Sequence, residues 1–588
     1  MTTKQQKLKT CLYENSYIIP SYQLYGGLSG YQDYGIEGVK IKNKIISMWR
    51  DFFVNDYKDK IVEIETPNVM PYLALKASGH VDRFTDYVVY DANGICYRAD
   101  HLAKNWFKNN NMNHMADKVD TWDNIILEHH INNYKMVTAP KDKTTGIIQK
   151  IDVIKKNLMF EVPSNNDNGI DFLRPELAQG IFVNYKTCQQ YLQKEPPFGI
   201  AQIGKSYRKE ISPQQYIRMR EFWQAEIEYF TEPLNKTHQC FDDFKDTIIP
   251  LLTFEMQNKN INNPIKISIK DAVDQKLISH KLMAYFLAKI FLFSIKIGLH
   301  EDKVRFRQHL PHEMAHYASE CWDLETFVND DWLECVGCAD RGSYDLQAHT
   351  VSGNLALKAK RLLQEEKLLT TYKVKLDSKL ISHRYKTLTN NITKYFNNLD
   401  QSQLKNLKDT MFKENDTLYI SIDDNICILT NDMIKIEEKV NIIQYEEYFP
   451  HVIEPSFGLD RLIYSVFEQN FWSRENDEKR IVLSLPSILS PYNIAIYSLH
   501  QNDKLQPLVD NIKTHLNISG FRCYTDESST NIGKRYVRAD EMGIKFVITV
   551  DYESLNDNQV TIRERDSMKQ IRIKIDDIID NLIKLNLV

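Results

Sequence analysis

The stretch AQIGKSYRKEISPQQYIRMREFWQAEIEYF, residues 201–230, decides the fold class of this chain. Two strand-like runs flank a short loop that contains Ser212-Pro213, which predicts an antiparallel hairpin. Because side chains two apart on a strand share a face, Arg208 and Glu210 project together near the turn. Arg218 and Arg220 form a similar pair on the returning run, which continues with Phe222, Glu226 and Glu228.

Arginines with an aromatic side chain between them can hold phosphates and stack a base. The same spacing also fits a solvated salt-bridge ladder across two strands, and spacing alone favours that simpler interpretation. No GxxxxGK[ST] or GxGxxG pattern occurs in the chain. If a nucleotide binds, arginines and not a glycine cradle must hold it.

Two stretches flanking the hairpin carry further acidic residues. In DFLRPELAQGIF (171–182), Pro175 predicts a helix start, and Glu176 there can bind an amine or complement the helix dipole. In DWLECVGCADRGSYDL (331–346), Glu334 is predicted to close a short strand, and Arg341 to follow a turn of small residues. Cys335 and Cys338 have the spacing of half a zinc site, but without a matching second pair a packed strand end is favoured.

The stretch EPSFGLDRLIYSVFEQNF (454–471) places Glu454 and Ser456 just before a helix and Arg461 in its first turn. An apolar stripe at helical spacing follows and predicts a helix face that is buried in the core. Its members are Leu459, Leu462, Ile463, Val466, Phe467 and Phe471.

Length and composition set the outer limits. With 588 residues the chain predicts two to four domains. The net charge of −5 limits nucleic-acid binding to local patches. Nine scattered cysteines predict a reducing compartment. The N-terminus has no signal or transit pattern, and no run approaches the roughly 20 apolar residues of a membrane span. A cytoplasmic protein without a membrane partner is expected.

The motifs together resemble glycyl-tRNA synthetase of the dimeric eukaryotic and archaeal type, a class II aminoacyl-tRNA synthetase. The resemblance covers residues 20–575 in family order. It rests on LYGGLSGYQDYG, LKASGHVDRFTD, YRADH, LRPELAQGIF, SYRKEISP, RMREF, RFRQH, EMAHYA, VGCADRGSYDL, EPSFGLDR, DESSTNIGKRYVRADEMG and RERDSMKQ. Motif 1 of the class is the helix and strand that end at Pro67, motif 2 is the hairpin, and motif 3 is GLDR.

The resemblance implies an α+β fold. It consists of an antiparallel-sheet catalytic domain with helical insertions and a C-terminal α/β anticodon-binding domain. Catalytic segments are expected at 1–102 (motif 1), 157–235 (motif 2), 301–353 and 441–478 (motif 3). Insertions are expected at 103–156, 236–300 (helical) and 354–440, and the anticodon-binding domain at 479–588.

The resemblance also implies the activity: glycine–tRNA ligase, which joins glycine to tRNA(Gly) with ATP and Mg²⁺, with diadenosine polyphosphate synthesis as a side activity. Implied ATP-binding residues are Arg208, Lys209, Glu210, Arg218, Met219, Phe222, Glu334, Cys335 and Arg461. Arg208, Arg461 and Glu334 are the implied catalytic residues, with Mg²⁺ at Glu334. Implied glycine-binding residues are Glu176, Glu226, Arg341, Glu454, Pro455 and Ser456, and implied tRNA-binding residues are Lys534, Arg535 and Arg538.

A homodimer is implied through the motif 1 helix of residues 38–54 and its strand. Leu177, Asp460 and a motif 2 loop shortened by one residue depart from the family pattern. Two alternatives stay open: a catalytically idle paralogue that acts as an RNA-binding module, and a class II enzyme for alanine or serine. The intact arginines argue against the first, and the Glu176, Glu226 and Glu-Pro-Ser set argues against the second.

Overall fold

The computed structural model describes residues 3–56, 59–116, 118–139, 149–165, 167–315, 318–413, 417–422, 425–475, 477–500 and 503–584. Residues 117 and 140–148 of the predicted insertion 103–156 lie outside these ranges. The chain divides into two compact units, one formed by 1–357 with 449–588 and the other by 358–448. None of the described helices is both long and apolar enough to cross a membrane.

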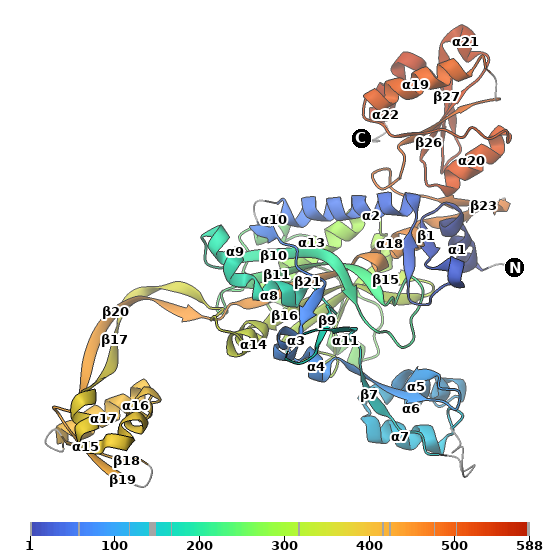
Figure 1. The fold of residues 1–588 in the computed structure, drawn as a ribbon. Helices are drawn as coiled ribbons and strands as arrows, with labels where there is room; N and C mark the ends of the chain where they lie inside the picture. Colours follow the sequence, from blue (N-terminus) through green and yellow to red (C-terminus); the bar gives the residue numbers. More distant parts are fainter. Residues whose placement is uncertain are drawn as a thin grey trace. The chain divides into compact units, whose positions relative to one another are not determined.

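A nine-stranded sheet forms the centre of the first unit (Figure 1). The 201–230 hairpin is strands β10 and β11, as predicted, joined by residues 208–220. Neighbouring strands are antiparallel except β12–β14 and β10–β3. The spatial order is β13 (Ile265–Ser268), β12 (Ile248–Leu252), β14 (Val304–Gln308), β15 (Glu320–Val328), β16 (Asp331–Gly342), β21 (His451–Gly458), β11 (Glu221–Thr231), β10 (Phe198–Tyr207) and β3 (Ile61–Glu63).

Three long helices cover one face of this sheet and form the main core with it. They are α2 (Ile36–Trp49), which continues as a π-helical turn over Arg50–Val54, α13 (Lys281–Lys296) and α18 (Leu459–Gln469). The predicted stripe on α18 is confirmed, because its members from Leu459 to Phe471 are at most 3% exposed. Alternate residues of β11 and β21, such as Ile227 and Phe457, meet these helices.

The opposite face is covered at one end by α8 (Ala178–Val183), α9 (Tyr185–Leu192) and α14 (Tyr344–Ser352). Their apolar side chains pack against Phe198, Ile200 and Phe230 of the hairpin. The rest of that face stays open, and the candidate site lies there.

Segment 236–300 differs from the expected helical insertion. It contains α10 (Phe241–Phe244), α11 (Phe254–Asn258), α12 (Ile269–Asp274) and α13, but β12 and β13 extend the central sheet. Helix α13 is buried almost throughout, since it packs beneath β16 and β21. Apolar residues around the whole helix indicate a buried helix, not an appended one.

Smaller elements surround the sheet. The N-terminus forms α1 (Lys4–Glu14), β1 (Ile18–Pro20) and β2 (Gln32–Tyr34). A three-stranded sheet joins β4 (Val69–Pro71), β9 (Ile170–Leu173) and β8 (Glu161–Pro163), next to α3 (Tyr72–Ala77) and α4 (His80–Arg83). Another joins β6 (Cys96–Arg98), β5 (Thr85–Tyr90) and β7 (Ile154–Asn157), and packs with α5 (Ala99–Asn109), α6 (Asn113–Ala116) and α7 (Asn124–Asn133).

After β22 (Phe471–Arg474) and β23 (Asp477–Leu483), the C-terminal part forms a five-stranded sheet. Its order is β25 (Cys523–Tyr524), β24 (Ile494–Ser498), β26 (Phe546–Val550), β27 (Gln559–Glu564) and β28 (Gln570–Lys574). The helices are α19 (Gln506–Ile518), α20 (Ile532–Glu541), α21 (Ser554–Asp557) and α22 (Ile578–Lys584). The predicted alternation of strands and helices is confirmed.

The second unit, Lys358–Tyr448, has its own core. Strands β17 (Ala359–Leu376) and β20 (Ile434–Tyr448) form a long antiparallel ribbon (Figure 1). At its end lie α15 (Ser378–Tyr385), α16 (Thr389–Asn397), α17 (Gln401–Lys413) and the hairpin β18 (Thr417–Ile422)–β19 (Asn425–Thr430).

Candidate active site

The open face of the central sheet carries a row of polar side chains. On β11, Glu226 shares a face with Glu228, and its register partner on β21 is Ser456, two residues from Glu454. Strand β16 adds Gly337 and Ala339 opposite Ser456 and Glu454. Small residues there leave room above the sheet, so the strand pattern itself produces a pocket lined with carboxylates.

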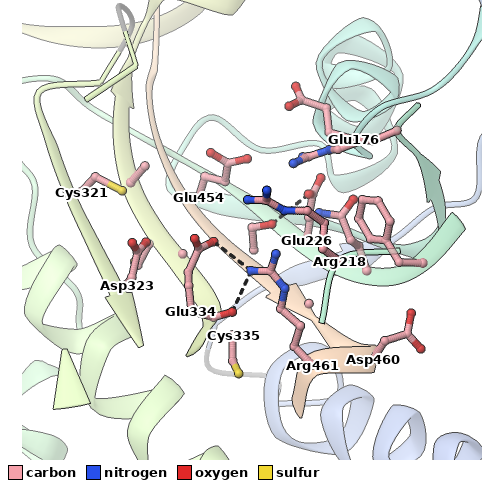
Figure 2. A pocket seen from close by; sticks show the side chains of 18 of the residues that line it. Glu176, Arg218, Glu226, Cys321, Asp323, Glu334, Cys335, Glu454, Asp460 and Arg461 are labelled. Carbon is pink, nitrogen blue, oxygen red and sulfur yellow. Dashed lines mark hydrogen bonds and ion pairs between the residues drawn. The ribbon is translucent and has the colours of Figure 1, made fainter. Parts of the chain in front are cut away.

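All of these residues except Glu228, which is fully buried, line a cavity of about 410 Å³. Figure 2 shows the carboxylates of Glu176, Glu226 and Glu454 above Arg461 and Glu334 in the same cavity. The predicted site residues that line it are Glu176, Arg208, Glu210, Arg218, Met219, Phe222, Glu226, Glu334, Cys335, Glu454, Ser456 and Arg461. The structure thus brings together residues that are up to 285 positions apart (176 to 461).

Glu226 lies at the centre of the acidic end and is 1% exposed. Its Oε2 accepts the Leu177 amide hydrogen at 2.8 Å, and its Oε1 accepts the Ser456 hydroxyl hydrogen at 2.9 Å. Burial, and then the neighbouring carboxylates of Glu454 and Glu176, raise the pKa of Glu226 to about 8. This carboxyl is therefore poised to ionise when a cation binds.

The pKa of Glu176 is shifted in the opposite direction to that of Glu226. Gln179 Nε2 donates to it at 3.0 Å, and His80 Nε2 lies 3.4 Å from its other oxygen. Burial opposes its ionisation most, but His80, Arg341 and Gln179 together hold the pKa of Glu176 below its ordinary value.

Arg341 lies behind the carboxylates and does not line the cavity. It is 1% exposed. It donates to both oxygens of Asp345 at 2.9 and 3.0 Å, and to Glu454 Oε2 at 2.9 Å. Arg341 was expected to bind glycine; in the structure it lies outside the cavity lining, next to Glu454, which does line it. The predicted turn before Arg341 is also wrong, because β16 runs without interruption from Asp331 to Gly342 and contains Glu334 as well.

The acidic end has more carboxylates than cations. The carboxyl groups of Glu176, Glu228, Asp345 and Glu454 interact with the guanidinium of Arg341, and Glu226 lies beside Glu176 and Glu454. Uncompensated buried carboxylates are costly. The site therefore favours a small cationic ligand.

The other end of the cavity has the opposite character. Arg208 donates from Nε to the Pro175 carbonyl at 3.1 Å, and its guanidinium lies 5.4 Å from the ring centre of Phe222. Within the described ranges no ion pair involves Arg208. Arg461 donates to the carbonyls of Ile217 and Glu334, both at 2.8 Å. Fixed guanidinium groups in a cavity favour an anion such as a phosphate.

Acidic side chains suited to a hard metal ion lie beside these arginines. The Glu334 carboxylate is 3.7 Å from Arg461 Nη1, and its side chain is 57% exposed. Asp323 is hydrogen-bonded to His309 at 2.6 Å. Burial raises the pKa of Asp323 to about 6, although the hydrogen bond with His309 lowers it. Carboxylate oxygens are ligands that Mg²⁺ prefers, so the donor chemistry fits the expected ion at Glu334.

Other predicted residues lie elsewhere. Lys209 and Pro455 do not line the cavity. Pro455 points away because strand side chains alternate. The Lys209 amide donates to the Leu158 carbonyl at 2.6 Å, and Leu158 does not line the cavity either. Arg535 is 2% exposed and donates to the carbonyls of Ser498 and Leu499, so it supports the fold and is unavailable to RNA.

Lys534 is exposed, whereas Arg538 pairs with Asp526 at 2.9 Å. Cys335 contacts Thr326 and Ser465, and Cys338 contacts Met283 in the core. The two thiols therefore belong to a packed strand and not to a zinc site.

The predicted helix start at Pro175 is displaced. Helix α8 begins at Ala178, because Arg174 is still extended and pairs with Asn68 and Tyr207 through its backbone. The departure at Leu177 is buried and contributes its amide to Glu226.

Asp460, the second departure, is also buried. It accepts hydrogen bonds from the Tyr34 hydroxyl and, at 2.7 Å, the Trp223 amide. Burial raises the pKa of Asp460. This aspartate therefore ties the N-terminal segment to the start of β11 and of α18.

The sequence interpretation did not identify His80, Gln179, Asp345 or Glu228 as residues of the site. His80 and Gln179 support Glu176, and Asp345 supports Arg341. Only Glu228 has a local signal, since it alternates with Glu226 along one strand. The others act through contacts between distant segments, which spacing does not reveal.

Comparisons with known proteins agree with this geometry. Residues 493–585 match the family model described as an anticodon binding domain. The chain is 39% identical to "Glycine--tRNA ligase" of Methanocaldococcus jannaschii, with 98% of each chain covered. It is 34% identical to "Glycine--tRNA ligase 2" of Saccharomyces cerevisiae, covering 99% of this chain and 96% of the relative.

Among solved structures, a prolyl-tRNA synthetase from Cryptosporidium parvum, crystallised with L-proline and AMP, matches with a TM-score of 0.50. The match covers 99% of this chain and 75% of the other, at 10% sequence identity. At that identity the likeness concerns the fold alone, which is the class II synthetase fold with its C-terminal domain.

Proposed function

This chain belongs to the glycine–tRNA ligase family, and from that premise we propose that it activates glycine with ATP and transfers it to the 3′ end of tRNA(Gly). The observation that carries the proposal is the two-ended cavity. Carboxylates without enough cations lie at one end, and fixed guanidinium groups lie at the other. Glycine and ATP together supply the missing charges: an ammonium for the carboxylates and phosphates for the arginines.

The ammonium of glycine is held by Glu176, Glu226 and Glu454. Three N–H donors match three carboxylates, and the Ser456 hydroxyl orients Glu226. Because the carboxylates surround the α-carbon, a side chain on it would collide with them. Selection of a larger side chain over a smaller one is limited to about 1–3 kcal/mol per methylene, whereas exclusion from a small pocket has no such limit.

ATP occupies the arginine end in this proposal. Arg208 lies on the α-phosphate, Arg461 on the γ-phosphate, and Phe222 against the adenine. Glu210, Arg218 and Met219 line the same wall, with Arg218 Nε 3.9 Å from Glu210. Mg²⁺ would be held at Glu334, where it would neutralise phosphate charge.

The reaction then needs no protein nucleophile. A glycine carboxylate oxygen attacks the α-phosphorus, and the bond to the bridging oxygen breaks to release pyrophosphate. Arg208, fixed by the Pro175 carbonyl, stabilises the charge that develops on the α-phosphoryl oxygens. In the second step, a hydroxyl of the terminal tRNA ribose attacks the glycyl carbonyl and AMP leaves. If a phosphate oxygen of a second ATP attacks the α-phosphorus of glycyl-adenylate instead, the bond to glycine breaks, glycine leaves and a diadenosine polyphosphate forms.

The C-terminal domain would bind the anticodon of the tRNA, as the match to the anticodon-binding model supports. Of the predicted contacts, Lys534 and Arg538 at helix α20 are the side chains that remain accessible to phosphates.

We also propose a homodimer, but through a different surface from the motif 1 helix that the sequence suggested. The apolar stripe of α2, including Ile41, Ile45 and Trp49, is buried within the same chain. Leu24, Tyr25 and Ile36 are 88%, 83% and 74% exposed, and a second copy would cover them. Sedimentation of wild type and of a Leu24→Lys/Tyr25→Lys variant tests this surface.

All nine cysteines are free, which supports a cytoplasmic location.

The test is charging of tRNA(Gly) with labelled glycine and ATP. Arg208→Gln is expected to lower the charging rate by about 10²–10³, the typical loss on removing one donor at a developing oxyanion. Lys209→Gln is the matched control and should charge normally, because Lys209 does not line the cavity. No charging by a folded wild-type chain would instead favour the idle RNA-binding paralogue.

A further inference from the structure

Glu228 has no assigned role, yet it lies beneath the proposed glycine site. Its side chain, in the middle of β11, is 0% exposed. Both of its carboxyl oxygens are buried and lack a hydrogen-bond partner among the described residues. An ionised carboxylate without a donor is one of the most costly groups to bury, so this arrangement requires a chemical explanation.

The strand register places Glu228 opposite Glu454. Strand β11 pairs with β21 so that Glu226 is opposite Ser456 and Tyr229 is opposite Ile453, and Glu228 therefore faces Glu454 across the ladder. Oxygens of Glu226, Glu228 and Glu454 all lie within 4.8 Å of one another. Like charges directly opposite on one face repel, so the two carboxyl groups cannot both ionise at low cost.

Among the described residues, Arg341 is the cation that lowers the pKa of Glu228, but it does not outweigh burial and the neighbouring carboxylates. From β16, Arg341 already donates to Asp345 and Glu454. From α14, Asp345 contributes a further negative charge. Strand β10 presents Ile200 as the register partner of Glu228. Burial, and then the charge of Glu454, raise the pKa of Glu228 well above its ordinary value.

We propose that Glu228 is a neutral carboxylic acid in the working enzyme and donates a hydrogen bond to Glu454, as a positioning residue for glycine binding. The inference rests on the proposed function. Glu454 is the acceptor, because both oxygens of Glu226 already receive a donor, from Leu177 and Ser456. On Glu454, Arg341 donates to Oε2.

This arrangement explains how Glu454 serves the ammonium. A donor on each oxygen, Arg341 on one and Glu228 on the other, keeps Glu454 ionised and fixes its orientation. Because Glu228 keeps its proton when glycine binds, it adds no negative charge of its own to the site. A buried acid kept neutral to act as a donor is known chemistry for enzyme sites.

Two substitutions of similar size separate the possibilities. Glu228→Gln keeps a neutral donor, so kcat/KM for glycine in pyrophosphate exchange should stay within about threefold of wild type. Glu228→Met removes the donor, and KM for glycine should rise about 10- to 100-fold, the range for a hydrogen bond to a charged group. KM for ATP should not change. Glu226→Gln, which removes a charge at the ammonium, is the comparison.

An infrared difference spectrum of wild type minus Glu228→Gln provides a readout that needs no activity. It should show the carbonyl stretch of a protonated carboxylic acid at neutral pH. A carboxylate band instead, or a Glu228→Gln loss as large as that of Glu226→Gln, would show that Glu228 is ionised and overturn the proposal. A Glu228→Met variant with unchanged KM for glycine would overturn the hydrogen bond.

The infrared band remains decisive if Glu228→Met fails to fold. If wild type shows no exchange with glycine, the proposed function fails, and the band then still reports the state of Glu228 alone.

Discussion

Arg341 is predicted to stabilise the glycine pocket without touching glycine. Arg341→Met removes the guanidinium that donates to Asp345 at 2.9 and 3.0 Å and to Glu454 at 2.9 Å. The methionine side chain is also apolar and unbranched, so it fills much of the same space. The carboxylates of Asp345 and Glu454, which are 2% and 9% exposed, then lose their cationic partner.

Breaking a buried ion pair by removing one partner costs about 3–5 kcal/mol. At about 2 °C per kcal/mol for a large domain, the melting temperature of the catalytic part should fall by ~6–10 °C. Scanning calorimetry is the assay. Arg50→Met is the matched control, because Arg50 pairs with Glu63 at 2.8 Å on the surface, where such a pair contributes about 0–1 kcal/mol.

The loss should also depend on pH. Burial raises the pKa of Glu454, and Arg341 opposes this shift. Without Arg341 the carboxyl prefers its neutral form in the folded state, so ionisation destabilises the variant above the ordinary carboxyl pKa. The gap between Arg341→Met and wild type should narrow as pH falls from 8 towards 5. Equal melting temperatures for Arg341→Met and Arg50→Met, or a gap that does not change with pH, would refute the reasoning.

Four further outcomes are expected. Glu226→Gln should raise KM for glycine at least about 100-fold in pyrophosphate exchange, since it removes a charge partner of the ammonium; an unchanged KM would contradict this role. Because the pKa of Glu226 is about 8 in the free pocket, glycine affinity measured by calorimetry should rise about tenfold per pH unit from 6 to 8 and level off above 8. A flat profile would count against that proton release. Asp460→Asn should weaken the fold by about 1–3 kcal/mol in denaturant unfolding, since Trp223 and Tyr34 donate to a charged acceptor. Lys534→Gln should weaken tRNA binding and reduce the slope of log K against log salt concentration by about one, the loss of one phosphate contact. Arg535→Met should instead lower the stability of the anticodon-binding domain.

Local patterns predicted the parts of the fold that local physics decides. The hairpin of β10 and β11 follows from alternation around Ser212-Pro213, and helix α18 follows from the stripe beginning at Leu459. The face that holds Glu226 and Glu454 is then set by strand periodicity. The roles of these residues came from the family resemblance, because spacing alone favoured a salt-bridge ladder.

Contacts between distant segments were beyond prediction from the sequence. Arg341 was expected to line the pocket. Its ion pairs with Asp345 and Glu454 instead hold the guanidinium behind the carboxylates. Arg535 was expected on a basic surface, yet its helix face packs on β24. The long apolar run of α13 made the whole segment 236–300 look helical. The strands β12 and β13 were missed because they are short and form only by pairing at the edge of the sheet.

The central claim is that crowded carboxylates select glycine for activation by ATP. The most direct test is ATP–pyrophosphate exchange by the purified chain, with glycine, alanine and serine in parallel. The account predicts exchange with glycine and at most a trace with the other two, because a side chain on the α-carbon would collide with the carboxylates. Comparable exchange with alanine or serine, or none with glycine from a folded protein, would contradict it.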